Sequence, residues 1–410
     1  MVWRTLLRRT PSIPVTKPIA IIGGGPAGSS AAEQLARRGH KVLLFDEKLA
    51  WEKPCGGGIT DKALVRYQYL RDVGIERNLV DRCELISPGG RRVTFDLGKP
   101  VAIFSRRVLN GFLLERAQEA GVEVRQQRIT AIQGHAGEWR LRTQHEDMKA
   151  EFIILATGAR NPFRAQFSRP YAPEDLMATA GYYIPGSTGC MQIRFLRGLH
   201  GYIWIFPRPN HFSAGICGRM GDKSTSELRR LLEQSLTERE LDFKGGTFYS
   251  HLLPSLRLTT LRHAPVDGDG WAAIGDAAGF TDPITGEGLY YALRSAELLA
   301  EAIIAEKPSS YRRGLRNDFL PELEMAARVA DRFFTGSWMG EAVTERMVQF
   351  TGSSPKFQQL ICDLFAGSQG YLTLRQRLYL SLPRMVAESA VNSLGLRRNK
   401  HVSSGAELQY

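Results

Sequence analysis

Short apolar runs that end at glycine-rich turns recur along the chain and predict the buried strands of a parallel sheet. They occupy residues 19–22, 42–45, 152–155 and 271–274. Stretches with helical patterning accompany these runs, at residues 29–38, 109–120 and 289–306. Because short apolar strands alternate with helices, the pattern predicts an α/β fold built around a parallel sheet.

A second pattern, strict alternation of polar and apolar residues, predicts an antiparallel sheet in the middle of the chain. It is clear at residues 191–195, and again where Tyr202, Trp204 and Phe206 recur at every second position. Side chains with that spacing share one face of a strand. The three rings therefore form either part of an ordinary sheet core or one wall of a pocket.

Composition sets the size of the protein and excludes several classes. With 410 residues, 43% hydrophobic and 23% charged, the chain suits two or three globular domains and not a disordered or fibrous protein. No apolar run approaches the roughly 18 residues of a membrane span. Five widely spaced cysteines and eight scattered histidines argue against a disulfide framework or a metal site, and favour a reducing, cytoplasmic compartment.

The net charge of +12 is concentrated at both ends of the chain. The first twenty residues carry four basic and no acidic residues, and residues 371–410 carry six basic and two acidic ones. Each end is either a solvated basic segment or a contact with an anionic membrane, which would make the protein peripheral on the inner face. Elsewhere the arginines are dispersed without a basic and aromatic module, so nucleic acid is not an expected partner.

The 41 glycines exceed the usual share of about 7%, and three clusters hold much of the excess. In the first, Gly23, Gly25 and Gly28 form G-x-G-x-x-G between a strand and a helix. Gly23 permits the tight turn, Gly25 lets the backbone approach a pyrophosphate, and Gly28 allows close packing of helix on strand. Such a loop presents the N–H groups of a helix N-terminus to phosphate.

The surroundings of this loop strengthen the prediction of a Rossmann-like dinucleotide site. Asp46 follows Gly28 by 18 residues, at the end of the next strand, where a carboxylate can accept both ribose hydroxyls. Glu47 is the neighbouring alternative. Pro26 and Ala27 complete the loop.

The other clusters and two further motifs suggest a family. One cluster begins with Gly275-Asp276 and continues, after Pro283, with Gly286 and Gly288 before a helix that starts at Leu289. The other cluster is Lys53-Pro54-Cys55-Gly56-Gly57-Gly58. Tyr202-x-Trp-x-Phe-Pro and the helix start at Arg106 agree with them. In these motifs the chain resembles the geranylgeranyl reductase family, within the flavoprotein superfamily that includes p-hydroxybenzoate hydroxylase.

That resemblance implies FAD as the cofactor and assigns roles around it. Asp276 would bind the ribityl chain, Arg106 would contact the cofactor, and a strand around Ile129 would pass the adenine. The remaining cofactor contacts would come from three segments. The first is the glycine loop with the two acids after the next strand: Gly23, Gly25, Pro26, Ala27, Gly28, Asp46 and Glu47. The second is Cys55, Gly56, Gly57 and Gly58, and the third is Gly275, Pro283, Gly286, Gly288 and Leu289.

The resemblance also implies the reaction, which is reduction of carbon–carbon double bonds in an isoprenoid chain by hydride from reduced flavin and a proton. Cys55 would be the acid or relay, or else a small residue filling space beside the flavin. Tyr202, Trp204 and Phe206 would line the substrate pocket. The substrate would be a prenyl lipid, prenyl diphosphate or quinone, and NADPH or reduced ferredoxin would supply electrons.

A flavin monooxygenase or halogenase of the same superfamily is the alternative. Against it, Thr157-Gly158 stands where such hydroxylases usually carry Asp-Gly. A peroxyflavin route also gives no reason for the Cys-Gly-Gly-Gly loop.

We expect three regions in the chain. A discontinuous FAD-binding domain would comprise residues 17–66, 101–165 and 258–306, with a small antiparallel meander at 139–148. An inserted antiparallel-sheet domain for the substrate would comprise residues 67–100 and 166–257. Residues 307–410 would form a mostly helical region.

Overall fold

The computed structural model describes residues 17–72, 74–186, 189–338, 340–374 and 376–380, together with 383 and 388. The basic segment predicted to be a tail or an anchor falls on residues 1–20, so nearly all of it lies outside the described residues. Most of the basic stretch 371–410 also lies outside them.

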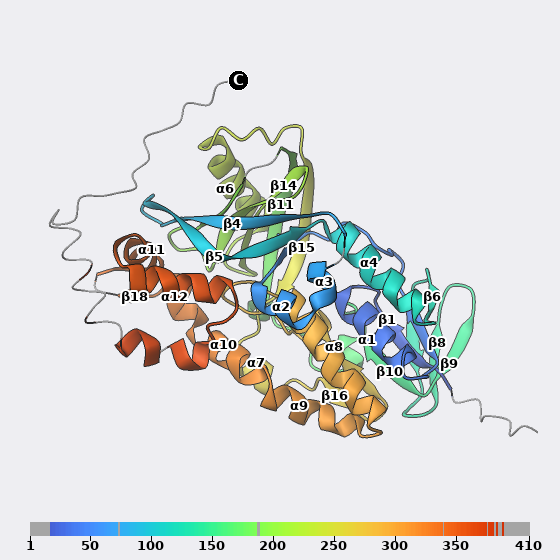
Figure 1. The fold of residues 1–410 in the computed structure, drawn as a ribbon. Coiled ribbons are helices and arrows are strands. Elements are labelled where there is room, and N and C mark those ends of the chain that lie inside the picture. The colour runs from blue at the N-terminus through green and yellow to red at the C-terminus, as the bar shows by residue number, and fades with distance from the viewer. Residues whose placement is uncertain are drawn as a thin grey trace, which may run out of the picture.

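A six-stranded, mostly parallel sheet forms one half of the fold (Figure 1). Its order is β16-β17-β10-β1-β2-β6, and only β16 runs antiparallel to its neighbour. The four apolar runs give β1 (Ile19–Ile22), β2 (Val42–Phe45), β10 (Phe152–Leu155) and β17 (Trp271–Ala273). The edges are β6 (Glu123–Arg125) and β16 (Asp267–Gly268). The predicted Rossmann-like sheet is confirmed.

Three helices cover this sheet, and α1 packs against the other two. They are α1 (Pro26–Ala36), α4 (Arg106–Glu119) and α8 (Leu289–Ile304). Helix α1 begins three residues before the predicted start because Pro26 occupies its first turn, where a fixed φ and a missing N–H cost nothing. The glycine loop therefore leads directly into the helix.

An eight-stranded sheet forms the other half, in the order β15-β11-β14-β13-β12-β4-β5-β3. It is antiparallel as predicted, apart from the parallel pair of β12 and β4. The strands are β3 (Gly58–Ile59), β4 (Arg77–Ile86), β5 (Arg92–Phe104), β11 (Leu176–Pro185), β12 (Cys190–Arg194), β13 (Gly201–Pro207), β14 (His211–Arg219) and β15 (Thr247–Pro254). The boundary expected between residues 100 and 101 falls inside β5.

The two faces of the large sheet are covered by different helices. Helix α6 (Thr225–Thr237) packs on one face, where Leu228 and Leu232 join a core with Ile203 and Ile205. The C-terminal helices lie over the other face, beneath β4 and β5 in Figure 1, and α11 and α12 contact β5. The C-terminal elements are α9 (Tyr311–Asn317), α10 (Leu320–Thr335), β18 (Ser337–Trp338), β19 (Glu341–Ala342), α11 (Val343–Ser353) and α12 (Pro355–Phe365).

The predicted meander is present as β7 (Ala131–Gln133), β8 (Trp139–Arg142) and β9 (Asp147–Ala150). The prediction of a strand around Ile129 was wrong, because β7 starts at Ala131. Pairing with β8 begins where the Thr130 N–H donates to the Arg142 carbonyl. Ile129 is buried before that ladder begins.

The short helices are α2 (Asp61–Arg66), α3 (Gln68–Asp72), α5 (Arg164–Phe167) and α7 (Leu258–His263). Within the described part of the chain, no helix has both the length and the apolar character needed to cross a bilayer.

Candidate functional site

The first glycine loop is shaped by close backbone contacts that a side chain would block. A Cβ on Gly28 would lie 1.8 Å from the Gly23 carbonyl oxygen, and a Cβ on Gly23, where φ is +113°, would lie 2.2 Å from the Ala156 oxygen. At Gly25, by contrast, a Cβ would meet no protein atom within 4 Å. Two glycines therefore close the turn, and the third leaves open space at the N-terminus of α1.

Asp46 fixes the other side of this open space. Its carboxylate accepts from the Gly24 N–H at 2.6 Å and from the Lys48 N–H at 2.8 Å. Glu47 is exposed and lies 3.8 Å from Arg128. Of the two acids, Asp46 is the one with a hydrogen bond to the glycine loop.

The turn after β17 brings Asp276 to the same region. Gly275, at φ +57°, packs where a Cβ would lie 3.0 Å from Ala27 of α1. Gly288 is the N-terminal cap of α8, and Leu289 is its first residue. Gly286 has a φ of +72°, and a Cβ there would meet the Tyr202 hydroxyl at 2.7 Å. The loop therefore lies close to both α1 and the aromatic strand β13.

The Cys55 loop lies against β13. A Cβ on Gly56 would approach the Phe206 ring to 2.6 Å, so only glycine allows this contact. The Cys55 carbonyl accepts hydrogen bonds from the Arg208 guanidinium at 2.7 Å and from the Ser213 hydroxyl at 2.8 Å. These two donors, from the β13–β14 hairpin, fix the position of the cysteine.

Glu52 links this loop to α4. Its carboxylate accepts from the Arg106 N–H at 2.8 Å and from the Ser105 hydroxyl, and so caps the helix N-terminus from a distant segment. It also pairs with the fully buried Arg208 at 2.5 Å. Burial alone would raise the pKa of Glu52, but the Arg208 charge and the N-terminal donors outweigh it, and the pKa lies below its usual value.

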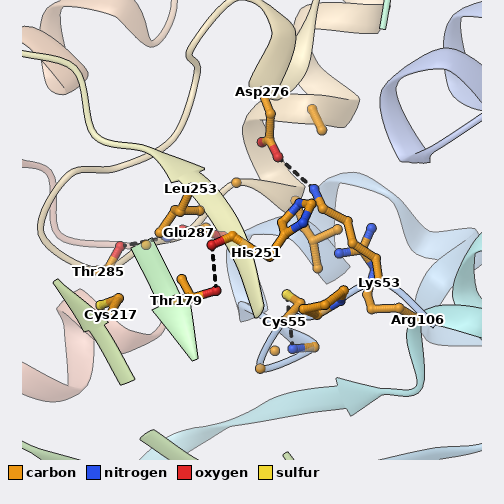
Figure 2. Close-up of a pocket in the computed structure, with 18 of the residues that line it drawn as sticks. Lys53, Cys55, Arg106, Thr179, Cys217, His251, Leu253, Asp276, Thr285 and Glu287 are labelled. Carbon is orange, nitrogen blue, oxygen red and sulfur yellow. Dashed lines mark hydrogen bonds and ion pairs between the residues drawn. The ribbon is translucent and has the colours of Figure 1, made fainter. Parts of the chain in front are cut away.

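Two contacts join the Cys55 loop to the loop that precedes α8. Before the cysteine, Lys53 forms an ion pair with Asp276 at 2.7 Å, and Figure 2 shows these side chains directed toward each other. After it, the Thr60 hydroxyl donates to the Glu287 carboxylate at 2.9 Å. Segments more than 200 residues apart in sequence are thereby held together on both sides of Cys55.

One continuous cavity of about 460 Å³ connects these loops. At one end it is lined by the glycine loop, Asp46, Cys55 and Asp276. Elsewhere it is apolar, and its wall includes Trp204 of the sheet. Phe206 also lines it and lies against Gly56, beside Cys55. Further wall residues come from the C-terminal helices: Val329, Phe333, Met347, Ile361, Leu364 and Phe365.

Charges around the cavity shift the pKa values of its titratable groups in different directions. Burial would raise the pKa of Cys55, but Arg106, the Gly57 N–H and Lys53 together lower it. Burial would also raise the pKa of Asp276, and the Lys53 charge and hydrogen bond lower it instead.

His251 and Glu287 are shifted mainly by burial. Burial lowers the pKa of His251 to about 3, with Lys53 adding to the shift, so the imidazole is neutral. Burial raises the pKa of Glu287 to about 7. In Figure 2 the His251 ring lies beside the Lys53–Asp276 pair, and Glu287 lies near Leu253 and Thr285.

The residues present fit FAD. The space beside Gly25 at the start of α1 suits a pyrophosphate, and Asp46 borders it. Three buried polar atoms of cavity-lining residues lack hydrogen-bond partners among the described residues: Arg106 Nε, Thr157 Oγ1 and His251 Nε2. Buried polar atoms are normally paired, so these three are consistent with a polar ligand in this space.

Most of the predicted site residues line this one cavity. These are Gly23, Gly25, Pro26, Ala27, Asp46, Cys55, Gly56, Gly57, Gly58, Arg106, Tyr202, Trp204, Phe206, Asp276, Gly286, Gly288 and Leu289. Gly28 and Gly275 pack closely against neighbouring segments, and Pro283 is buried, but these three do not line the cavity; nor do Glu47 and Ile129. Ile129 borders a separate hollow with residues 128–133.

Sequence reasoning did not identify several residues of the site. Lys53 stood inside a recognised motif, and Glu287 stood between two predicted glycines, yet neither was given a role. His251 and Arg208 carry no local signal. Helices α10, α11 and α12, which supply part of the cavity wall, have amphipathic sequences. An amphipathic sequence predicts a buried face but does not identify what that face packs against.

Comparisons with known proteins identify similar oxidoreductases. Residues 17–168 match the family model described as pyridine nucleotide-disulphide oxidoreductase. The chain is 31% identical to geranylgeranyl diphosphate reductase of Rhodobacter capsulatus, over 70% of this chain and 74% of that protein. It is 28% identical to the Synechocystis protein of the same name, over 72% and 77%. It is 27% identical to menaquinone reductase of Mycobacterium tuberculosis, over 71% and 78%.

Solved structures show the same fold. A geranylgeranyl bacteriochlorophyll reductase-like protein of Thermoplasma acidophilum aligns with a TM-score of 0.73 at 19% identity, covering 88% of this chain and 98% of that one. A flavin-dependent brominase aligns with a TM-score of 0.68 at 17% identity, covering 90% and 99%.

Proposed function

Because this chain belongs to the geranylgeranyl reductase-like family of FAD-dependent oxidoreductases, we propose that it saturates carbon–carbon double bonds in the isoprenoid chain of a lipid, diphosphate or quinone. The observation that carries the proposal is the single cavity that passes from the cofactor loops to an apolar wall. A long hydrocarbon chain suits such a wall. Relatives named for geranylgeranyl diphosphate and for menaquinone support the substrate class.

Bound FAD, when reduced, would supply the hydride. The chain's own residues would bind and shield the reactants. Asp46 and the α1 N-terminus would hold the ribose and the pyrophosphate. Asp276 and the N-terminus of α8 would hold the ribityl chain and the flavin edge. Tyr202, Trp204 and Phe206 would exclude water from the alkene.

Cys55 belongs to this proposal as the residue beside the flavin. Its loop is held by Arg208 and Ser213, and its pKa is lowered by Arg106. The sequence left open whether it moves a proton or fills space. Turnover of Cys55→Ser distinguishes the two roles, because a serine of similar size fills the space but is a much weaker acid.

The test of the proposed function is an anaerobic assay. The FAD-loaded protein is reduced with dithionite and mixed with all-trans prenyl diphosphates, menaquinone or a prenyl phospholipid. The expected result is product heavier by successive pairs of hydrogens, with reoxidised flavin. No mass gain with any of these compounds, together with oxygen-dependent hydroxylation or halogenation of another compound, would refute it in favour of the monooxygenase alternative.

NADPH and reduced ferredoxin are the two electron donors within the proposal. The first glycine loop is the single complete dinucleotide fingerprint of the chain, and FAD takes it. The net charge of +12 would suit an acidic ferredoxin, but it would equally suit a lipid phosphate or diphosphate. Mixing the oxidised enzyme with each candidate donor without oxygen identifies the true donor. That donor should bleach the flavin absorbance at a rate higher than the turnover rate.

Contact with a membrane surface completes the proposal. Tyr371 and Leu374 line the apolar end of the cavity, and the nearby Leu372, Tyr379 and Leu380 are exposed by 49%, 65% and 77%. Exposed apolar groups beside a basic stretch suit an anionic interface. Sedimentation with vesicles of anionic lipid, and its loss with neutral lipid or high salt, is the expected result.

A further inference from the structure

Reduction of an isolated double bond needs a proton as well as a hydride, and the cavity offers few groups that can hold one. Among the described residues that line it, three carboxyl groups are present: Asp46, Asp276 and Glu287. Asp46 accepts two backbone N–H bonds, and Asp276 pairs with Lys53. The Lys53 charge stabilises the carboxylate of Asp276 and not the acid.

Glu287 has a different environment. It is half-buried between Gly286 and Gly288, and its carboxyl accepts one hydrogen bond, from Thr60 at 2.9 Å. No cationic side chain in the described part of the chain forms an ion pair with it within 4.0 Å. A partly buried carboxyl group that has no ion-pair partner keeps its proton more readily than an exposed one.

The groups around Glu287 agree with this picture. Lys62 approaches from α2, but its ammonium lies over the Tyr290 ring, 4.1 Å from the ring centre. Asp282, from the same loop, is buried and accepts from the Tyr371 hydroxyl at 2.8 Å, and Tyr291 of α8 lies nearby. Burial raises the pKa of Glu287 to about 7, and Asp282 adds to it, while Thr60 and Lys62 oppose it.

The position of this acid also suits the reaction. The neighbouring Thr285 carbonyl accepts from the Tyr202 hydroxyl at 2.5 Å, so the loop that carries Glu287 touches the aromatic strand. Through Thr60 it is joined to the segment that follows the Cys55 loop. Glu287 therefore lies where the cofactor end of the cavity meets the apolar wall.

We propose that the Glu287 carboxyl donates the proton that completes reduction of the double bond. This inference rests on the proposed function. The π bond of the alkene breaks, one carbon forms a C–H bond with the hydride, and the other forms a C–H bond with the Glu287 proton. The two electrons would come with the hydride that FAD supplies when bound and reduced, Glu287 would be left as a carboxylate, and a proton from solvent would restore it.

The kinetic test compares wild type, Glu287→Gln and Thr60→Val in anaerobic single turnovers from about pH 6 to 9. The wild-type rate should fall above about pH 7, where the acid is ionised. Glu287→Gln should lower the rate constant by roughly 10²–10⁴, with substrate affinity little changed and the alkaline fall abolished. Thr60→Val removes a bond to the charged form, so the alkaline fall should move to higher pH.

A spectroscopic test is independent of turnover. Infrared difference spectra between acidic and alkaline pH should show the carbonyl band of a protonated, water-shielded carboxyl in wild type and in Cys55→Ser, but not in Glu287→Gln. A wild type without this band, or an active wild type whose Glu287→Gln variant keeps its rate and alkaline fall, would overturn the inference. A wild type that reduces no prenyl compound refutes the proposed function itself, and the proton-donor role with it, whether or not the band is present.

Discussion

Replacing Arg208 by methionine should destabilise the protein and loosen the Cys55 loop. The guanidinium is fully buried and donates both to Glu52 and to the Cys55 carbonyl. Methionine keeps much of the apolar stem but leaves both acceptors without this donor. Removing one partner of a buried ion pair costs about 3–5 kcal/mol. Because Glu52 is 18% exposed and keeps its bonds from Ser105 and Arg106, we expect the lower end, about 3 kcal/mol.

The assay is thermal and urea unfolding of the FAD-free protein. At about 2.1 cal/mol/K of unfolding entropy per residue over 410 residues, 3 kcal/mol lowers the melting temperature by about 3–4 °C. A double-mutant cycle with Glu52→Gln isolates the pair, and the double variant should lose about 2 kcal/mol less than the sum of the single variants. Losses that add within about 0.5 kcal/mol would refute the coupling.

The pair also has a predictable dependence on pH. The pKa of Glu52 lies below its usual value of 4.5, so the carboxylate is charged throughout the neutral range. Its contribution to stability is present above that value and is lost as the pH falls through the lower folded pKa. The difference between wild type and Arg208→Met should therefore be constant near neutral pH and shrink under acid. A difference that instead grows on acidification would contradict this assignment.

Three other predictions concern the cavity. Gly28→Ala should lower both the melting temperature and the FAD content, because the new Cβ would lie 1.8 Å from a backbone oxygen. Gly25→Ala should leave the stability of the apoprotein unchanged, because a Cβ there meets no protein atom within 4 Å. Its affinity for FAD, measured by equilibrium titration, should fall at least about tenfold, or about 1.4 kcal/mol. Leu364→Trp should fill the apolar end and abolish turnover of long prenyl chains without FAD loss, and Leu372→Trp, at an exposed neighbouring position, should not. Cys55→Ser should react more slowly in the anaerobic assay if the thiol moves a proton; unchanged turnover assigns it to packing.

Local sequence patterns predicted the parts of the fold that short segments determine. Strands β1 and β2, the glycine loop between them and the start of α8 each follow from a few neighbouring residues. The boundary expected between residues 100 and 101 was not marked by any local pattern. Residues 101–104 are buried and form the end of β5, where they pair antiparallel with β4.

Contacts between distant segments could not be predicted in the same way. The Arg208–Glu52 pair joins residues 156 positions apart, and the Lys53–Asp276 pair joins residues 223 apart. A lysine or glutamate in a loop usually remains solvated, so its type and spacing do not reveal the partner. The pattern of α12 predicts a helix with one apolar face, and only the packing shows that Leu364 borders the cavity.

The two contacts between the Cys55 loop and the α8 loop explain why acid and base properties separate within one cavity. Lys53 supplies a cation to Asp276 and, after Arg106 and the Gly57 N–H, helps to lower the pKa of Cys55, whereas the contact at Thr60 brings a hydroxyl to Glu287. Burial alone would raise the pKa of both carboxyl groups. The Lys53 charge nevertheless favours the ionised form of Asp276, whereas burial favours the protonated form of Glu287. Sites that push the pKa values of two groups apart assign them different tasks. By this reasoning Asp276 is the carboxylate that stays charged, and the proposed proton is held at Glu287.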